Sequence, residues 1–262
     1  MELLGRVAIV TGSTRGIGRA IALGLAEAGC SVVVAARTES PRRRLPGTIY
    51  TMAEEIQALG RPALPVTCDV RDEESVRSMV GKTLAEFEHV DILVNNAGIG
   101  AYTPFLETPV DIWDRVLAVN LRGTFLCSQA VLPVMVKRRR GSIINISSLA
   151  ANLVRTEGGT HGEVEDARFI GQPYGAAKAA VERLSRGLAA EMEVHNIAVN
   201  ALKPAKPVLT EGFKLQRPDA DWSLWVGPEY MVRAALFLAR QDASGLTGAV
   251  VTDEELIESY DL

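Results

Sequence analysis

The chain alternates short runs of β-branched and aliphatic residues with longer stretches of helical periodicity, and this alternation restricts the fold more than any other feature. The short runs are almost continuously apolar, as in strands that are buried on both faces of a sheet. Strands that alternate with helices predict an α/β fold, with a parallel, doubly wound, Rossmann-type sheet of about seven strands flanked by helices. The expected strands are residues 6–11, 31–36, 63–68, 91–94, 142–147, 197–202 and 249–252. The expected helices are residues 17–28, 51–59, 73–87, 110–137, 174–194 and 228–240.

The length of the chain predicts one domain. It has 262 residues, and α/β domains run to about 250 residues without division. No repeat or low-complexity linker interrupts the alternation, so residues 1–262 are expected to fold as a unit. Two long segments without periodicity, near residues 150–173 and 205–227, each follow an expected strand. Because open α/β sheets bind ligands at the carboxyl ends of their strands, we expect these segments to wall a substrate pocket.

The composition argues against several classes of protein. A net charge of −4 disfavours a nucleic-acid ligand. No apolar run approaches the roughly 18 residues of a membrane span, and the first residues lack the basic and apolar regions of a signal peptide. The three cysteines are too scattered for a disulfide framework, which predicts free thiols in a reducing cytoplasm. They are Cys30, Cys68 and Cys127.

A glycine-rich turn separates the first expected strand from the first helix. Glycines there let the backbone turn tightly and approach a pyrophosphate, and the helix N-terminus offers free N–H groups to the phosphates. The spacing is GxxxGxG rather than GxGxxG, and the alternative is a purely structural turn. The position after the first strand favours dinucleotide binding. The residues concerned are Gly12, Ser13, Thr14, Arg15, Gly16, Ile17 and Gly18.

The end of the second expected strand indicates which cofactor is bound. An acidic residue there binds the ribose 2′-hydroxyl of NAD, whereas an arginine accommodates the 2′-phosphate of NADP. The strand ends in Arg37 without a carboxylate, and Arg15 lies in the glycine turn. Two guanidinium groups suit one phosphate, so NADP(H) is expected in preference to NAD(H). The alternative for Arg37 is a solvated loop residue.

Tyr174 and Lys178 are four residues apart and therefore lie on one face of an expected helix. A free tyrosine has a pKa near 10, which is too high for a base at neutral pH. A neighbouring ammonium group favours the phenolate, so we expect Lys178 to lower the pKa of Tyr174. Tyr174 could then act as a general acid or base. An ordinary amphipathic pair is the alternative.

In order, these motifs resemble those of the short-chain dehydrogenase/reductase family from residue 5 to about residue 248. The stretch at residues 45–49 further resembles a subgroup of hydroxysteroid-dehydrogenase-like proteins. The resemblance implies cofactor contacts from the glycine turn, from Tyr174 and Lys178, and from further positions along the chain. Those positions are Arg37, Asp69, Val70, Asn96, Ala97, Gly98, Pro204, Val208 and Thr210.

The same resemblance implies four catalytic residues: Asn120, Ser148, Tyr174 and Lys178. Ser148, rather than Ser147, would hydrogen-bond the reacting oxygen and stabilise its developing charge. Lys178 would also hold the nicotinamide ribose, and Asn120 would anchor a water that links Lys178 to solvent. A strand-end cap for the serine and a bent helix for Asn120 are the alternatives.

The chain departs from the family pattern at three places. Ser148 and Tyr174 are 26 positions apart, about twice the usual gap, so residues 152–170 are expected to loop out as a lid or a subunit contact. Ala205 stands where the family usually has glycine. The acidic stretch at residues 253–257 is expected to form a short helix in place of the usual tetramer contact. A homodimer through residues 110–137 and 174–194, or a homotetramer, remains the expected assembly.

These observations predict an NADP(H)-dependent oxidoreductase that transfers hydride between the cofactor and an alcohol or carbonyl substrate. The apolar residues after position 212 favour a lipophilic substrate. A non-catalytic redox sensor that binds NADP(H) is the first alternative, and an isomerase or dehydratase is the second. Isolated histidines argue against a metal site, and the absence of GxSxG at Ser148 argues against a hydrolase. The histidines are His89, His161 and His195.

Overall fold

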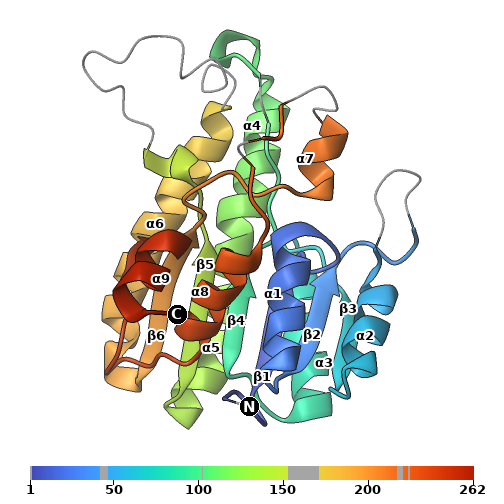
Figure 1. Cartoon of the computed structure of the whole chain (residues 1–262), viewed down its shortest axis with the longest axis vertical. Coiled ribbons are helices and arrows are strands. Elements are labelled where there is room, and N and C mark those ends of the chain that lie inside the picture. The colour runs from blue at the N-terminus through green and yellow to red at the C-terminus, as the bar shows by residue number, and fades with distance from the viewer. Residues whose placement is uncertain (1, 42–46, 102, 153–170, 217–220, 224) are drawn as a thin grey trace.

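The computed structural model describes residues 2–41, 47–101, 103–152, 171–216, 221–223 and 225–262. In this part of the chain, seven parallel strands form one sheet in the order β3-β2-β1-β4-β5-β6-β7 (Figure 1). The expected Rossmann-type architecture is therefore confirmed. The strands are β1 (Val7–Thr11), β2 (Ser31–Ala36), β3 (Ala63–Thr67), β4 (Ile92–Asn95), β5 (Gly141–Ile146), β6 (Ile197–Lys203) and β7 (Val250–Thr252).

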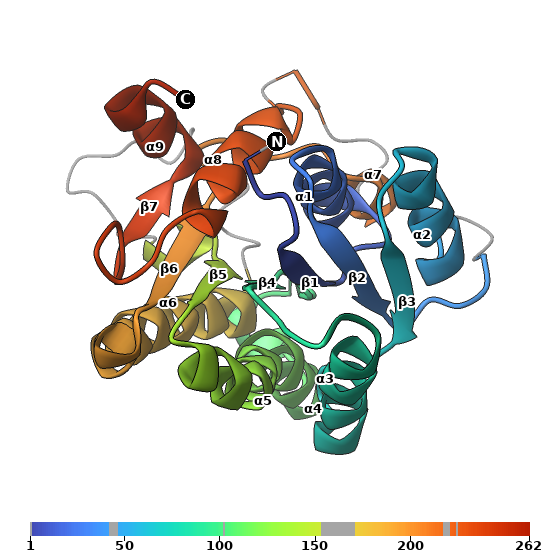
Figure 2. The ribbon, with the colours of Figure 1, turned by 90° about the horizontal axis from the view of Figure 1, so that it is seen from below.

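Helices cover both faces of the sheet (Figure 2). One face packs against α1 (Gly16–Glu27), α2 (Ile49–Ala58), α8 (Glu229–Ala239) and α9 (Asp253–Tyr260). The other packs against α3 (Glu73–Phe87), α5 (Gly123–Arg138) and α6 (Gln172–Met192). Alternate residues of the strands supply the two cores: Ala8 and Val10 belong to the first, whereas Ile9 belongs to the second. Burial on both faces explains why the strands lack polar alternation.

The strand order reverses direction beside β1, which pairs with β2 on one side and β4 on the other. Such a switch point opens a crevice at the carboxyl ends of the strands, where open α/β sheets bind ligands. The glycine turn, the end of β4 and the end of β5 all lie at this edge. The edge is therefore the place to look for a functional site.

The long helix expected over residues 110–137 forms as three continuous parts. These are α4 (Val110–Leu117), a π-helical turn η2 (Ala118–Arg122) and α5. By length and composition it could cross a membrane, and it is the one helix of the described residues that could. Half of its most apolar window is buried against the protein, as in a core helix of a folded domain. Leu126, Val131 and Met135 are among the buried side chains.

Four short elements complete the described structure. The 3₁₀ turns η1 (Phe105–Glu107) and η3 (Leu149–Asn152) follow β4 and β5, and η5 (Glu193–His195) follows α6. Helix α7 (Glu211–Gln216) lies within the segment for which no regular element was predicted. The expected short helix in the acidic tail is α9, whose Thr252 cap accepts a hydrogen bond from the Glu255 N–H. Nearly all of the expected insertion, from residue 153 to residue 170, lies outside the described residues.

Candidate active site

Glycines 12 and 18 let the turn after β1 pass directly against the end of β4. Gly12 has a φ of +66°, and a Cβ on it would lie 2.9 Å from the Cα of Ala97. A Cβ on Gly18 would lie 2.2 Å from the Asn96 Nδ2. Side chains at either position would force the two segments apart, so the sequence pattern here reflects close backbone packing as well as ligand approach.

Asn96 holds this turn from the side of β4. Its Nδ2 donates to the carbonyl oxygens of Thr11 and Gly12 at 2.8 and 3.1 Å. In return, the Thr11 hydroxyl accepts the backbone N–H groups of Asn96 and Ala97 at 3.0 and 3.1 Å. The side-chain amide of Asn96 therefore fixes the glycine turn, and its expected contact with the cofactor stays a prediction.

The start of α1 has the properties of an anion site. Arg15 provides no side-chain cap, and no acidic residue lies in the first turn. The Gly16 N–H instead donates to the Glu211 carboxylate at 3.1 Å, so an anion from α7 already lies against this helix end. The Ser13 hydroxyl is buried beside it and has no hydrogen-bond partner among the described residues. Free N–H groups, close-packed glycines and an unpartnered hydroxyl fit a dinucleotide pyrophosphate.

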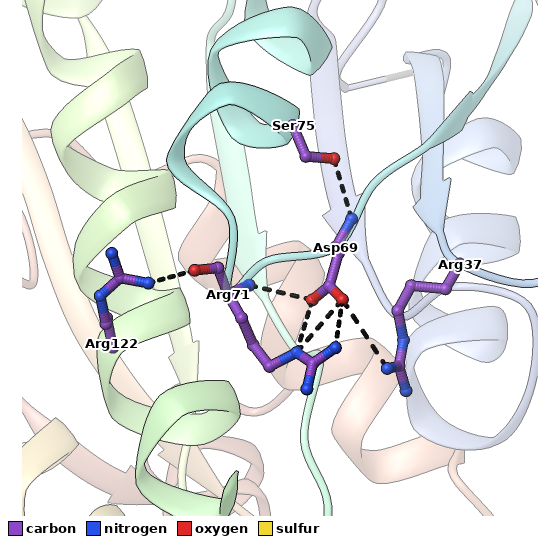
Figure 3. A network of polar contacts seen from close by, with 5 residues as sticks. All are labelled: Arg37, Asp69, Arg71, Ser75 and Arg122. Atoms are coloured by element: carbon purple, nitrogen blue, oxygen red, sulfur yellow. Dashed lines mark hydrogen bonds and ion pairs between the residues drawn. The ribbon is translucent and has the colours of Figure 1, made fainter. Parts of the chain in front are cut away.

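A basic corner lies at the carboxyl ends of β2 and β3 (Figure 3). The Arg15 Nη2 donates to the Thr38 hydroxyl at 3.0 Å, which brings the glycine turn to the residue beside Arg37. The Arg37 guanidinium is half-exposed and lies 3.8 Å from the Asp69 carboxylate. Both arginines named by the sequence therefore meet at the end of β2. Arg42, Arg43 and Arg44 lie outside the described residues.

Asp69 is held mainly by Arg71, which the sequence analysis did not single out. Arg71 binds both carboxylate oxygens, with its Nη2 at 2.6 Å from Oδ2. This hydrogen-bonded pairing, with a smaller contribution from Arg37, lowers the pKa of Asp69. Arg122, the last residue of the π-helical turn, donates to the Arg71 carbonyl oxygen (Figure 3). The network leaves Arg37 as the arginine most weakly bound to Asp69.

The two serines after β5 point to different partners. Ser147 donates to the buried Glu182 carboxylate at 2.9 Å. Ser148 is hydrogen-bonded to Tyr174, and this bond acts to lower the pKa of the phenol. Ser148, the serine preferred from the sequence, is therefore the one that meets Tyr174.

Burial has the larger effect on Tyr174. The residue as a whole is partly exposed, but desolvation of its phenol raises the pKa above the ordinary value and outweighs the bond from Ser148. The expectation that the neighbouring ammonium lowers this pKa is not met in the free protein. The Lys178 Nζ lies 5.6 Å from the centre of the Tyr174 ring, and it donates to the Ile146 carbonyl oxygen at 2.6 Å instead.

Lys178 is buried, and the cost of desolvation lowers its pKa to about 8. Its ammonium group lies beside Gly98: a Cβ at that position would be 3.8 Å from the Lys178 Nζ and 3.1 Å from the Asn120 Oδ1. The segment after β4 thus passes close to two of the expected catalytic side chains. A lysine with this pKa changes charge close to neutral pH.

Asn120 lies in the π-helical turn η2, a rare irregularity that is frequent at functional sites. Its Oδ1 accepts the Ile99 N–H at 2.8 Å, and its Nδ2 donates to the Ile99 carbonyl oxygen at 2.9 Å. Its main-chain oxygen accepts the Thr124 hydroxyl at 2.9 Å. Asn120 therefore fixes the segment after β4, and its expected role as a water anchor stays a prediction.

The loop after β6 closes the site over the glycine turn. Thr210 lies so near that a Cβ on Gly16 would be 3.1 Å from its Cγ2. Val208 is buried and pairs with Val226 as an isolated bridge. These contacts place Thr210 beside the glycine turn, and its expected contact with the cofactor stays a prediction.

An aromatic cluster supports α7. Phe213 packs against Trp225 with ring centres 5.0 Å apart, and Trp222 packs against Trp225 at 4.9 Å. Leu215 is partly exposed on the same helix, and Leu224 lies outside the described residues. In the described part of the chain, no group of three His, Cys, Asp or Glu side chains could hold a metal.

Comparison with known families agrees with this geometry. The family model for short chain dehydrogenases matches residues 6–220, which include the glycine turn and all four expected catalytic residues. The chain belongs to the short-chain dehydrogenase family. Members of this oxidoreductase family bind a nicotinamide cofactor, as the crevice suggests.

Several short-chain dehydrogenases are similar along nearly the whole chain. Hydroxysteroid dehydrogenase-like protein 2 of Danio rerio is 37% identical over 258 residues, covering 98% of this chain and 59% of the relative. A short chain dehydrogenase structure from Mycobacterium thermoresistibile has a TM-score of 0.85 at 33% identity, covering 98% and 88%. A metagenomic short-chain oxidoreductase in complex with NADP has a TM-score of 0.76 at 29% identity, covering 96% and 98%. The chain spans 59% of the length of the Danio rerio relative and 60% of the length of the Homo sapiens protein of the same name.

Two features of this short-chain dehydrogenase were not found from its sequence. Ala205, which replaces the usual glycine, donates its N–H to the Asp253 carboxylate at 2.7 Å. The C-terminal helix α9 thereby holds the loop that carries Thr210, and Lys206 adds an ion pair with Glu254 at 2.7 Å. These contacts join segments that are far apart in the sequence, so no local sequence pattern predicts them.

Proposed function

We propose that the chain is an NADP(H)-dependent oxidoreductase that interconverts an alcohol and a carbonyl compound, with Tyr174 as the general acid or base. The observation that carries this proposal is the meeting of three groups at one point of the crevice. Tyr174 is hydrogen-bonded to Ser148, and Lys178 lies beside both Tyr174 and the end of β4. A proton donor, a hydroxyl that can bind an oxygen and a buried ammonium group are the parts required for this chemistry.

In the proposed reaction, each side chain has a separate task. Ser148 donates a hydrogen bond to the substrate oxygen and stabilises the charge that develops there. Tyr174 gives its phenolic proton to that oxygen during reduction, or accepts the alcohol proton during oxidation. Lys178 holds the cofactor ribose and, as an ammonium group, favours the phenolate. Hydride transfer is the chemistry that a nicotinamide supplies.

The buried Lys178 also suits proton movement. Its pKa of about 8 makes both charge states accessible near neutral pH, so it can pass a proton as well as hold one. Asn120 lies beside Gly98, as Lys178 does, and its side chain holds Ile99 in the segment after β4. We propose that a proton leaves Tyr174 along this side of the site, with Asn120 anchoring the water that receives it.

The preference for NADP(H) rests on the basic corner. Arg37 is half-exposed directly after β2, where a ribose-binding acid would stand, and Arg15 reaches Thr38 next to it. Asp69 is neutralised by Arg71, so it repels a phosphate less than a free carboxylate would. The NADP complex of the metagenomic relative supports the same choice.

A lipophilic substrate is proposed from the surroundings of the site. The aromatic cluster of Phe213, Trp222 and Trp225 lies in the segment that follows the nicotinamide loop. Aromatic side chains contribute large apolar contact areas to small-molecule pockets. The similarity to hydroxysteroid dehydrogenase-like protein 2 agrees with this class of substrate.

We further propose that the chain forms a homodimer through residues 110–137 and 174–194, which contain α4, η2, α5 and α6. A shallow, largely apolar groove lies there, and Phe125 is 45% exposed within it. Exposed apolar patches of this kind mark contacts with other proteins. The groove is lined by Asp114, Leu117, Ala118, Leu121, Arg122, Phe125 and Leu184.

The proposal is tested by titrating the protein with NADPH and NADH and then following cofactor absorbance with a panel of ketones, quinones and steroids. Tighter binding of NADPH, with turnover of at least one carbonyl substrate, is expected. Tighter binding of NADH would refute the roles of Arg15 and Arg37. Cofactor binding without turnover on the whole panel would favour a redox sensor.

A further inference from the structure

Glu182 is a buried carboxylate that the proposed reaction does not use. It lies one helical turn beyond Lys178 on α6, and only 3% of its surface is exposed. A buried charge is costly unless it is paired and hydrogen-bonded. The ion pair and hydrogen bonds of Glu182 therefore indicate the role of a carboxylate at this position.

The charge of Glu182 is balanced by Lys203, the last residue of β6. The Lys203 Nζ lies 3.1 Å from the Glu182 Oε1, and both residues are buried. Lys203 immediately precedes Pro204, at the start of the loop that covers the glycine turn. Lys178, whose pKa desolvation lowers to about 8, lies one turn earlier on α6 and makes its own contact with the Ile146 carbonyl oxygen.

The remaining contacts of Glu182 bracket Ser148. The Ser147 hydroxyl donates to Oε1 at 2.9 Å, and the Asn152 Nδ2 donates to Oε2 at 3.0 Å. Ser147 precedes Ser148, and Asn152 ends the 3₁₀ turn that follows it. The Glu182 carboxylate therefore accepts hydrogen bonds from residues on both sides of Ser148.

The main-chain hydrogen bonds around Ser148 do not by themselves attach this residue to α6. The Ser147 N–H donates to the Leu202 carbonyl oxygen at 2.7 Å, which ends the pairing of β5 with β6. Beyond that point Ser148 accepts the Ala150 N–H at 3.2 Å, a contact within its own turn. The Glu182 carboxylate adds two side-chain hydrogen bonds between this segment and α6, the helix that carries Tyr174.

We propose that Glu182 is a positioning residue, which holds Ser147 and Asn152 so that Ser148 faces Tyr174. The inference rests on the function proposed above only where turnover is measured. The register of α6 on β5 supports it: Tyr174 meets Ser148, Glu182 meets Ser147, and Ser185 accepts a hydrogen bond from Asn145 at 2.9 Å. From Tyr174 to Ser185 along α6, these partners run from Ser148 back to Asn145 on β5, and Glu182 meets the residue next to Ser148.

The first test removes the donor rather than the charge. Ser147→Ala leaves the ion pair of Glu182 and Lys203 intact. Its matched control is Ser142→Ala, which removes another buried hydroxyl of β5, one that donates to Leu238 at 2.8 Å at the opposite end of the strand. With tyrosine labelled at ¹³Cζ and the Tyr174 signal assigned by Tyr174→Phe, the signal should move in Ser147→Ala and stay in Ser142→Ala.

The second test removes the acceptor while keeping the shape of the side chains. Glu182→Met with Lys203→Met is neutral and lacks an acceptor, whereas Glu182→Gln with Lys203→Met is neutral and keeps one. The Tyr174 signal should shift in the first double variant and remain close to wild type in the second. With a turned-over substrate, kcat should fall about 10-fold in Ser147→Ala and in the Met/Met variant, with the KM for cofactor unchanged.

Either spectroscopic result decides the inference without turnover. An unchanged Tyr174 signal in folded Ser147→Ala refutes it, even if the wild-type protein is an active oxidoreductase. A shifted signal in a protein that turns over no substrate supports the positioning role and counts against the proposed function alone. If the variant with Glu182→Met and Lys203→Met does not fold, the Tyr174 signals of Ser147→Ala and Ser142→Ala still test whether Glu182 positions Ser148.

Discussion

Ser148 and Tyr174 are hydrogen-bonded to each other although they are 26 positions apart in the sequence. The contact forms because α6 packs beside the end of β5, which is Ile146. The Lys178 Nζ on α6 donates a hydrogen bond to the Ile146 carbonyl oxygen. The long segment between the two residues therefore does not separate them. The chemistry proposed for this protein depends on this pair.

Tyr174→Phe removes the only proton that the proposed mechanism transfers from the protein to the substrate. We expect kcat to fall about 1,000-fold, within the range typical of general acid–base catalysis, while NADPH affinity changes little. Tyr50→Phe, at an exposed position on α2, is the control. Steady-state kinetics and a cofactor titration measure both quantities. Retention of more than a tenth of the wild-type kcat would exclude Tyr174 as the acid.

Lys178→Met should stabilise the free protein at neutral pH while abolishing turnover. A pKa lowered from 10.5 to about 8 corresponds to about 3 kcal/mol, and the lost hydrogen bond to Ile146 offsets about 1 kcal/mol. The free energy of unfolding at pH 7 should therefore rise by about 2 kcal/mol.

The pH dependence of the same variant has a definite sign. Below pH 8 the wild-type folded state carries the buried charge. Between pH 8 and 10.5 the unfolded state binds more protons than the folded state, so wild-type stability rises with pH in this window. The advantage of Lys178→Met should accordingly shrink from pH 7 to pH 10 in urea denaturation. An advantage that grows with pH would contradict the buried-ammonium explanation.

Arg37→Ala should weaken NADPH binding about 10-fold and leave NADH binding nearly unchanged, because one charge-assisted contact to the 2′-phosphate is lost. Arg77→Ala, on the exposed surface of α3, serves as the control. Fluorescence titrations at two salt concentrations measure the effect. Equal losses for both cofactors would show that Arg37 supports the fold of the crevice and does not select the phosphate.

Glu211→Gln should tighten NADPH binding about fivefold, since a negative charge no longer lies at the N-terminus of α1. Glutamine keeps an oxygen that can accept the Gly16 N–H, so α7 should remain in place. Glu258→Gln, on the exposed face of α9, tests for a general effect of charge. Pyrophosphate should also bind more tightly to Glu211→Gln, and weaker binding of both ligands would mean that Glu211 helps to form the site.

Phe125→Arg should convert the proposed dimer into a monomer, because a charge would be buried in the apolar groove that α4, η2, α5 and α6 line. Leu4→Arg changes an exposed leucine in another part of the chain and should leave the assembly unchanged. Light scattering coupled to size exclusion gives the mass of each variant. A dimer that persists in Phe125→Arg would place the interface elsewhere.

Much of the fold follows from local patterns. The expected ranges for β2 and α3 agree with the structure at both ends, since a run of valines and an acid-capped amphipathic stretch are strong local signals. Helix α7 was missed because its six residues are too few to show a period. The π-helical turn at Asn120 was also missed, because it changes hydrogen bonding without changing the apolar pattern.

By itself, the sequence determined the α/β class, the glycine turn at the first strand and the helical spacing of Tyr174 and Lys178. These features depend on neighbours within a few residues, so chain order is enough to define them. Only the tertiary structure decided that Ser148 rather than Ser147 meets Tyr174, that Glu211 lies on the glycine turn, and that burial governs the pKa of Lys178. Hydrogen-bond partners and desolvation depend on which distant segments pack together, and that packing is a property of the folded chain alone.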